Sequence, residues 1–365
     1  MLREGDDPKK WSTRISPFFR LSAKDKIIFF KYLAVMTEAG IPLERALIAI
    51  HNQSNSTVLH RVLHVMLNDT ASGEFLSTSL KKMPHLFDML LTNLITVGET
   101  SGTLTSALFR ISEHLEKTKE LRSKIRSAFL YPSIVITGTL LTTAYMLFVL
   151  LPQLLPLFSS LNVELPWITK MVIAVSSFLL ANGLWIFLTV VAVVIVFLLL
   201  TRIEKVHYAV DFLILRIPLV GVMIRKVQVT LFSRILSTLL MSGTSIVEAF
   251  TIASTSLNNR VYRKALSIIG STIQEGESIS SYLAKHSDLF SPLVTQMVSV
   301  GEETGKLDES FDFVAKFTEK ELDDATKTLT TVLEPLLMVF IGALVGVVAI
   351  AIITPIYSLT QGLQR

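Results

Sequence analysis

Apolar residues follow two patterns along this chain, and the first is a set of long stretches without charge. Asp, Glu, Lys and Arg are absent from Ser127–Val163, Met171–Thr201 and Pro335–Gln364. Because roughly 20 apolar residues in a helix cross a bilayer core, each stretch is long enough to span a membrane. We predict spans near Tyr131–Leu151, Ser177–Leu200 and Leu336–Ile356. The alternative, buried helices of a large soluble protein, is disfavoured because segments such as VVAVVIVFLLL have no polar face.

The second pattern is a spacing of three and four residues between apolar positions, which is typical of helices with one buried face. Ser22 and Asp25 begin the first such segment as a cap, and Gly40 ends it. No alternating segment of useful length indicates a strand. The helices expected before the first span are 22–39, 43–50, 55–69, 74–81, 86–97 and one from 104 through 126 into the membrane. Those expected before the third span are 223–241, 246–255, 259–274, 278–285, 292–300 and one from 307 onward.

The chain also repeats itself at an offset of 203 residues, without a gap over about 120 residues. The matched pairs include Gly40 and Gly243, Gly98 and Gly301, Glu99 and Glu302, Gly102 and Gly305, Pro132 and Pro335, and Pro152 and Pro355. Glycine and proline at fixed positions set backbone turns, so the repeat indicates two copies of one fold. Each copy consists of a helical segment followed by a span.

We therefore predict an all-α integral membrane protein with two homologous six-helix bundles and three transmembrane helices. The expected order is an N-terminal arm (1–21), a first bundle (22–129), a first span (130–152), a short loop (153–170), a second span (171–201), a second bundle (202–334), a third span (335–357) and a tail (358–365). The second span has no counterpart in the repeat and returns the chain to its starting side.

The distribution of Lys and Arg predicts the orientation of the spans. Residues 1–129 carry 18 basic residues and residues 202–334 carry 14, whereas the loop between the first two spans carries only Lys170. We expect the N-terminus and both bundles in the cytoplasm, and the loop and the C-terminus in the periplasm. The first 26 residues lack an apolar core, so no cleavable signal peptide is predicted.

Composition narrows the function classes. Half of the 365 residues are hydrophobic and 18% are charged, with a mean hydropathy of +0.55, and the apolar excess belongs to the spans. The absence of cysteine excludes disulfides and cysteine-based metal sites, and a net charge of +4 does not indicate nucleic-acid binding. His60 and His64 share a helix face but lack the other residues of a zinc protease site, and Gly301–Lys306 lacks the spacing of a phosphate loop. No catalytic residues, cofactor or metal are predicted.

The most distinctive segments are VGETSGTL (97–104) and VGEETGKL (300–307). One interpretation is structural: each is a corner between two helices, in which Gly102 and Gly305 take positive φ and Thr103 or Lys306 starts the next helix. The other interpretation is functional: Glu99 and Glu302 face outward and dock a partner.

Further positions allow both a structural and a functional interpretation. The acidic run from Glu302 to Asp324 is either a solvated face or a surface for a basic partner or another copy. Gly342 and Gly346 permit close helix approach, either within the chain, between copies or with a foreign apolar helix. Pro132 and Pro335 stand at the membrane entry of their helices and are candidate hinges.

Two helical bundles, three spans, the long repeat and the paired G-E-x-x-G-x-L corners together resemble the type II secretion F family. These are the inner-membrane platform proteins of type IV pili and type II secretion systems. The resemblance covers about residues 22–360, and the short N-terminal arm is similar to the type IVb pilus branch.

The resemblance implies a non-enzymatic role as the assembly core of a pilus machine in the bacterial inner membrane. It implies a cytoplasmic secretion-type hexameric ATPase, pilin subunits, other inner-membrane pilus alignment proteins, further copies of the same chain and membrane lipid as partners. The alternative within the family is a secretion platform that moves a pseudopilus. Outside it, a small transporter is disfavoured by the absence of charge in the spans, and a receptor by the short loop at 152–170.

Overall fold

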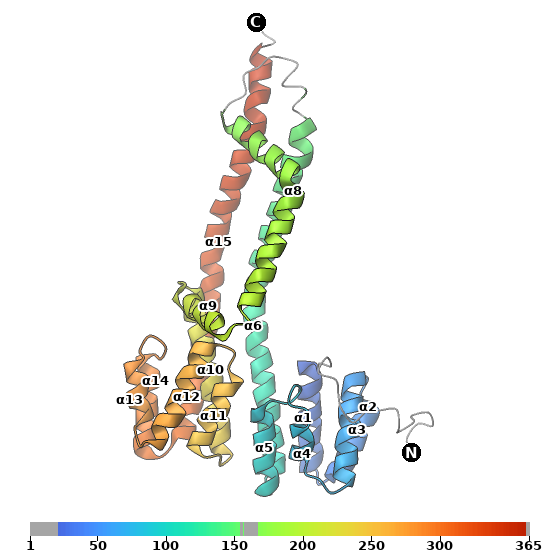
Figure 1. Ribbon diagram of the computed structural model, residues 1–365, viewed down its shortest axis with the longest axis vertical. Coiled ribbons are helices and arrows are strands. Elements are labelled where there is room, and N and C mark those ends of the chain that lie inside the picture. Colours follow the sequence, from blue (N-terminus) through green and yellow to red (C-terminus); the bar gives the residue numbers. More distant parts are fainter. Residues whose placement is uncertain (1–20, 154–155, 157–166, 363–365) are drawn as a thin grey trace. The chain divides into compact units, whose positions relative to one another are not determined.

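The computed structural model of the protein describes residues 21–153, 156 and 167–362. Most of the predicted N-terminal arm, most of the loop at 153–170 and the last three residues of the tail lie outside these residues. The described residues form helices and no strands, so the all-α prediction is confirmed. Figure 1 shows these helices, with the first bundle in blue to teal and the second in yellow to orange.

The helices of the two repeats have nearly the same bounds once 203 residues are added. In the first repeat they are α1 (Ala23–Glu38), α2 (Leu43–Gln53), α3 (Thr57–Ala71), α4 (Leu76–Lys81), α5 (Met89–Thr100) and α6 (Leu104–Tyr145). In the second they are α10 (Val220–Met241), α11 (Ile246–Ser256), α12 (Arg260–Gln274), α13 (Ile279–Lys285), α14 (Pro292–Thr304) and α15 (Leu307–Gly362). The bounds of α2 and α11, and of α3 and α12, differ by exactly the sequence offset, so the repeat in sequence is a repeat in structure.

Local chemistry explains where these helices begin and end. Ser22 begins α1 by accepting a hydrogen bond from the backbone N–H of Asp25, as the sequence predicts. The glycines that follow helices take positive φ in matched pairs: Gly40 and Gly243, Gly73 and Gly276, and Gly102 and Gly305. A left-handed residue ends a helix without strain only where there is no Cβ, which accounts for glycine at these repeated positions.

Phenylalanines form the centre of each bundle at equivalent positions. Phe29 lies 6.5 Å from Phe87 between ring centroids, and both side chains are buried. Their counterparts Phe232 and Phe290 are 5.8 Å apart and meet edge to face, and the hydroxyl of the buried Tyr262 donates to the carbonyl of Leu289. Each bundle therefore has its own aromatic core.

The chain divides into two compact units. One contains residues 1–123 and 211–322, which include the bundle helices of both repeats, and the other contains residues 124–210 and 323–365, which include the apolar helices. The unit boundaries fall inside α6 and α15. The predicted ends of the bundles, at 129 and 334, stay predictions.

Three helices in the described residues are long and apolar enough to cross a membrane, as the sequence predicts. They are the helix from Leu104 to Gln153, α8 (Trp167–Leu200), and the part of α15 from Leu307 to Thr354. The first ends in a π-helical turn, η2 (Met146–Leu150). The membrane-spanning unit is held together where Ser176 of α8 donates to the carbonyl of Leu147 and Thr169 donates to that of Ala351.

One helix was not predicted. α9 (Glu204–Arg216) follows the second span and meets α10 at a bend of 111°. At this bend Leu219 has a φ of 63°, and Gly221 lies against the backbone of Leu215, where a Cβ would come within 2.2 Å of the carbonyl oxygen. By length and composition alone, α9 and α10 together also qualify as a broken fourth span.

Candidate functional site

The first glycine–glutamate corner joins α5 to α6 through three residues with separate tasks. Gly98 allows close packing, because a Cβ there would lie 2.7 Å from the Cβ of Ala107 on α6. The carboxylate of Glu99 accepts hydrogen bonds from the backbone N–H groups of Leu76, at 2.6 Å, and Ser77, at 3.1 Å. Gly102 makes the turn with a φ of 71°. The corner therefore ties three helices together.

The second corner repeats this arrangement between α14 and α15. A Cβ at Gly301 would lie 2.6 Å from the hydroxyl of Ser310, and Gly305 turns the chain with a φ of 72°. The carboxylate of Glu302 accepts from the N–H of Ile279, and from both the N–H and the hydroxyl of Ser280. In each repeat the glutamate thus caps the first turn of the short helix, α4 or α13, where backbone donors lack partners.

These contacts confirm the structural interpretation of the corners and correct one part of the docking hypothesis. The expectation that Glu99 and Glu302 face outward is wrong, because both carboxylates are half-buried and bonded to backbone donors of a neighbouring helix. The expected positive φ at Gly102 and Gly305 is confirmed, and the next helices begin one residue later than expected, at Leu104 and Leu307. The tips of the corners, including Gly102 and Gly305, are exposed.

The candidate hinge residues lie within continuous helices. α6 extends from Leu104 to Tyr145 with Pro132 inside it, and α15 extends from Leu307 to Gly362 with Pro335 inside it. A proline inside a helix removes one backbone donor, so each helix has a weak point there. The hinge role stays a prediction.

The small-residue face of the third span is open in the described residues. A Cβ added to Gly342 or Gly346 would meet no described atom within 4 Å. Among the described residues, packing within the chain therefore does not use this pair of glycines. Of the three interpretations, contact between copies and contact with a foreign apolar helix stay predictions.

Much of the acidic run of α15 is neutralised by cations of the same chain. Glu319 pairs with Arg234 at 2.5 Å, and Glu321 pairs with Lys226 at 2.6 Å. Further along, Asp323 pairs with Lys124 of α6 at 2.9 Å. These pairs bear against a purely solvated face and leave less negative charge for a basic partner than the sequence suggests.

The two bundles contact each other within their common unit. The side-chain amide of Asn93 on α5 donates to Glu248 on α11 at 2.6 Å and accepts from the hydroxyl of Thr244 at 3.3 Å. Arg110 on α6 lies 3.2 Å from the sulfur of Met241 at the end of α10. The face formed by α5 and α6 therefore packs on the face formed by α10 and α11.

A cleft of about 150 Å³ remains where α6, α10 and α15 meet. Its charged lining consists of Arg110, Glu113, His114, Lys117, Arg234, Asp312, Lys316 and Glu319. Burial lowers the pKa of His114 to about 4; the carboxylate of Asp88 acts to raise it, and the charge of Arg234 lowers it further. In the described structure, Nδ1 of His114 is buried without a hydrogen-bond partner. His114 is therefore neutral at physiological pH.

Metal and cofactor sites find no support in the part of the chain that the structure describes. No three His, Asp or Glu residues there are grouped in a way that could hold a metal ion. His60 bonds to the carbonyl of Ser54, and its ring lies 4.4 Å from that of His51, so it has a packing role.

Comparison with known proteins identifies the repeat independently. The family model for protein F of the type II secretion system matches twice, at residues 29–152 and 232–355, which are again 203 residues apart. The chain is 37% identical over 336 residues to the type IV pilus assembly protein PilC of Thermus thermophilus, covering 92% of this chain and 82% of that one. It is 33% identical to PilC of Pseudomonas aeruginosa, covering 98% and 97%, and 30% identical to type II secretion system protein F of the same species, covering 93% and 84%.

Proposed function

Because the chain belongs to the type II secretion system protein F family, a family of non-enzymatic platform proteins, we propose that it is the inner-membrane platform protein of a type IV pilus machine. In this role it couples a cytoplasmic hexameric ATPase to the insertion or extraction of pilin subunits. The observation that carries the proposal is the double family match, in which each matched segment joins a helical bundle to an apolar helix. The most similar relatives named above are pilus assembly proteins, which favours a pilus over a secretion pseudopilus.

The arrangement of the chain supports this role in physical terms. The N-terminus and both bundles lie in the cytoplasm, where a motor has access to them, and the C-terminus lies in the periplasm. Motor-driven displacement of the bundles moves the spans through the weak points at Pro132 and Pro335. The open glycine face at Gly342 and Gly346 lets a pilin's apolar helix approach closely.

The exposed tips of the corners are the proposed docking points for the ATPase. Glu99 and Glu302 fix the shape of these corners, while the residues between them and the turn glycines contact the partner. Thr100 and Glu303 occupy equivalent positions at the two tips and are exposed. Arginine at these positions changes the surface charge without removing a capping carboxylate.

Deletion of the gene in its own host tests the platform role. We expect surface pili, counted by electron microscopy, to disappear and to return with the wild-type gene. Normal pili together with lost protein secretion would instead support the secretion alternative, and normal pili with normal secretion would contradict both. Solute flux through liposomes containing only the purified protein would support the transporter alternative.

The docking role of the tips requires a separate measurement. We expect Thr100→Arg with Glu303→Arg to reduce co-purification of the ATPase from membranes by about tenfold, while Lys316→Gln, elsewhere on the surface, leaves it unchanged. Unchanged co-purification of the tip variant would remove the corners from the docking model without affecting the platform role.

A further inference from the structure

The contact between the two bundles uses a different face of each repeat. The leading face of the first bundle contains Asn93, Arg110 and His114 of α5 and α6. The trailing face of the second bundle contains Arg234, Met241 and Glu248 of α10 and α11. Asn93 bonds to Glu248, Arg110 contacts Met241, and His114 lines the cleft beside Arg234. One leading face and one trailing face are therefore covered within the chain.

Because the fold is repeated, each chain also has a second leading face and a second trailing face. Adding 203 to the leading positions gives Gln296, Phe313 and Phe317 on α14 and α15, and subtracting 203 from the trailing positions gives Lys31, Glu38 and Arg45 on α1 and α2. All six side chains are exposed. These two faces are not covered by each other in the chain.

The uncovered leading face is apolar where its covered counterpart is polar. Phe313 is 45% exposed and Phe317 is 37% exposed, and their rings stack at 6.1 Å with an interplanar angle of 18°. His114, the equivalent of Phe317, is only 8% exposed. Two adjacent exposed phenylalanines on a helix outside the apolar segments are typical of a binding surface.

The uncovered trailing face has matching apolar residues. Val35 of α1 is 50% exposed and Ile48 of α2 is 43% exposed. Tyr32 is 43% exposed, whereas its counterpart Ile235, at the covered face, is 3% exposed. The same position is therefore buried in one repeat and left open in the other.

The charges of the two uncovered faces are complementary. Lys316 and Lys320 lie on the leading face beside the phenylalanines, and both are exposed. Glu38 and Glu116 lie on or beside the trailing face, and Glu116 keeps 42% of its side chain exposed in its pair with Lys31. Opposite charges around an apolar centre favour one pairing of surfaces over others.

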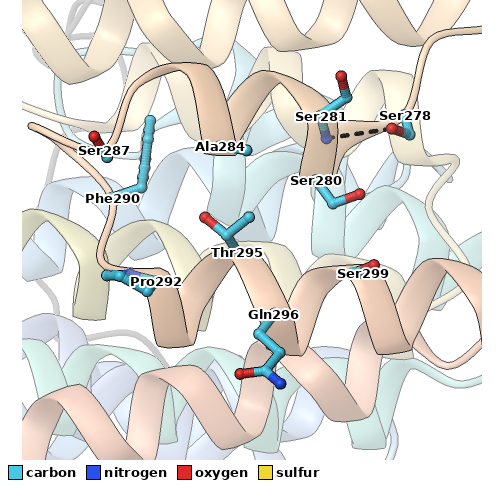
Figure 2. Close-up of a pocket in the computed structure, with 10 residues that line it drawn as sticks. All are labelled: Ser278, Ser280, Ser281, Ala284, Ser287, Phe290, Pro292, Thr295, Gln296 and Ser299. Carbon is cyan, nitrogen blue, oxygen red and sulfur yellow. Dashed lines mark hydrogen bonds between the residues drawn. The ribbon is translucent and has the colours of Figure 1, made fainter.

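A groove on the leading face gives this pairing a more specific position. It has a volume of about 570 Å³ and lies between α13 and α14, with Pro292, Gln296 and Ser299 along α14 (Figure 2). Met89, the equivalent of Pro292, is approached within the chain by the hydroxyl of Thr255 at the end of α11. The residue equivalent to Thr255 is Asn52, near the end of α2.

We propose that the leading face of the second bundle binds the trailing face of the first bundle in a second copy of this chain. The contact between copies then repeats the contact between the two bundles within one copy, with α2 of the second copy beside the groove of α13 and α14. Each copy keeps one leading and one trailing face, so the assembly is head to tail and closes into a ring where the rotation permits. Each repeat leads from a bundle into an apolar helix, which lets all copies share one bilayer.

Disulfide trapping tests the pairing directly, because the chain has no cysteine of its own. The pair Asn93 and Glu248 within the chain corresponds to Gln296 of one copy and Arg45 of the next. We expect the full-length variant Arg45→Cys with Gln296→Cys to form covalent dimers and larger species in membranes under mild oxidation. Disulfides require Cα atoms within about 7 Å, so the reaction reports a specific register.

Two matched variants make the result decisive. Asn93→Cys with Glu248→Cys is the positive control and must form its disulfide within one chain, without a change in mass. Asn68→Cys with Gln296→Cys places the first cysteine on exposed α3, away from the trailing face, and must stay monomeric. Absence of covalent oligomers in the Arg45 and Gln296 variant, with a working positive control, would overturn the proposal. So would covalent dimers of the Arg45→Cys single variant, because they indicate a two-fold contact.

A second measurement uses no cysteine. Phe313→Glu with Phe317→Glu places charge on two already exposed positions, so the bundle keeps its core. We expect this variant in detergent to lose most of the oligomeric mass seen by light scattering, with its helical content unchanged. An unchanged mass would contradict the proposal. Both tests need neither ATPase nor pilin, so their failure is distinguishable from failure of the platform role.

Discussion

The two repeats place the same kind of ion pair at equivalent positions in opposite surroundings. In the first bundle Lys31 and Glu116 meet at 2.7 Å with about half of each side chain exposed. In the second, Arg234 and Glu319 meet at 2.5 Å with 12% and 15% exposed. The pair at the surface has lysine and the covered pair has arginine, whose planar group is better suited to a buried carboxylate. The comparison shows that the backbone plan was kept while each surface was adapted to its surroundings.

The largest expected effect comes from removing one charge of each pair. Glu319→Gln leaves the buried guanidinium of Arg234 without its counter-charge, and we expect it to lower the free energy of unfolding by about 3 kcal/mol. Glu116→Gln removes an exposed partner and should cost less than about 1 kcal/mol. Thermal unfolding of the full-length variants in detergent measures both. Equal losses would contradict the difference in burial on which the comparison rests.

The buried His114 adds an acid-sensitive element that the second repeat lacks, because Phe317 stands in its place. The folded-state pKa of about 4 lies below the usual value of 6.5, so the unfolded chain binds a proton more readily than the folded one. The resulting stability is complete above about pH 6.5 and is lost as the pH falls towards 4. At most about 3 kcal/mol is involved, from 1.36 kcal/mol per pKa unit.

We expect the variant His114→Gln to show a smaller loss of thermal stability between pH 7 and pH 4.5 than the wild type. His85→Gln, at an exposed position, is the matched control and should follow the wild type. The groups facing His114 keep titrating in both variants; they are Arg110, Glu113 and Lys117 of α6, Arg234 of α10, Asp312, Lys316 and Glu319 of α15, and Asp88. An unchanged acid loss in His114→Gln would assign the effect to these groups instead.

The sequence predicts the local plan of both repeats well, because that plan depends on short-range chemistry. Ser22, Gly40 and Gly102 act on neighbouring residues, and a charge-free stretch of sufficient length indicates a span by itself. α9 was missed because Glu204 begins it only four residues after α8 ends, where the sequence offers one continuous segment without a glycine or proline break.

Contacts between distant residues could not be predicted in the same way. Glu99 was expected to face outward because its partners, Leu76 and Ser77, lie 23 and 22 residues earlier and carry no side-chain signal. The burial of Arg234 depends on which face the other bundle covers. A signal did exist in the repeat itself: His114 aligns with Phe317 and Tyr32 with Ile235, and such mismatches at equivalent positions indicate faces with different surroundings.

The two corner glutamates give a smaller effect and compare the repeats at their most similar point. Glu302 accepts three hydrogen bonds and Glu99 accepts two, so we expect Glu302→Ala to cost about 2 kcal/mol and Glu99→Ala about 1 kcal/mol. Hydrogen exchange should rise at the first amides of α13 and α4, respectively. Glu303→Ala, at the neighbouring exposed position, is the control with no change at these amides. Equal exchange in all three variants would return Glu99 and Glu302 to the outward-facing hypothesis.

The smallest effect concerns the apolar helices that follow the two bundles. α8 belongs to neither repeat, yet its hydroxyls bond to both spans at nearly equivalent positions: Ser176 to the carbonyl of Leu147 in the π-helical turn, and Thr169 to that of Ala351, where 147 + 203 is 350. Both hydroxyl donors have low exposure, and Leu151, Val172 and Ala351 pack around them. The bonds therefore fix the unpaired helix against both repeats at one level.

Removing these hydroxyls tests whether α8 holds the two spans equally. Ser176→Ala and Thr169→Val should each lower the thermal stability of the protein in bilayers by about 0.6 kcal/mol, the average for such bonds between membrane helices. Thr189→Val is the matched control, because the hydroxyl of Thr189 bonds only to Trp185 of its own helix. A loss confined to Ser176→Ala would indicate that the π-helical turn, whose wider ring weakens its own hydrogen bonds, depends on α8 while the regular α15 does not. The symmetry of the repeats would then end where α6 changes to η2.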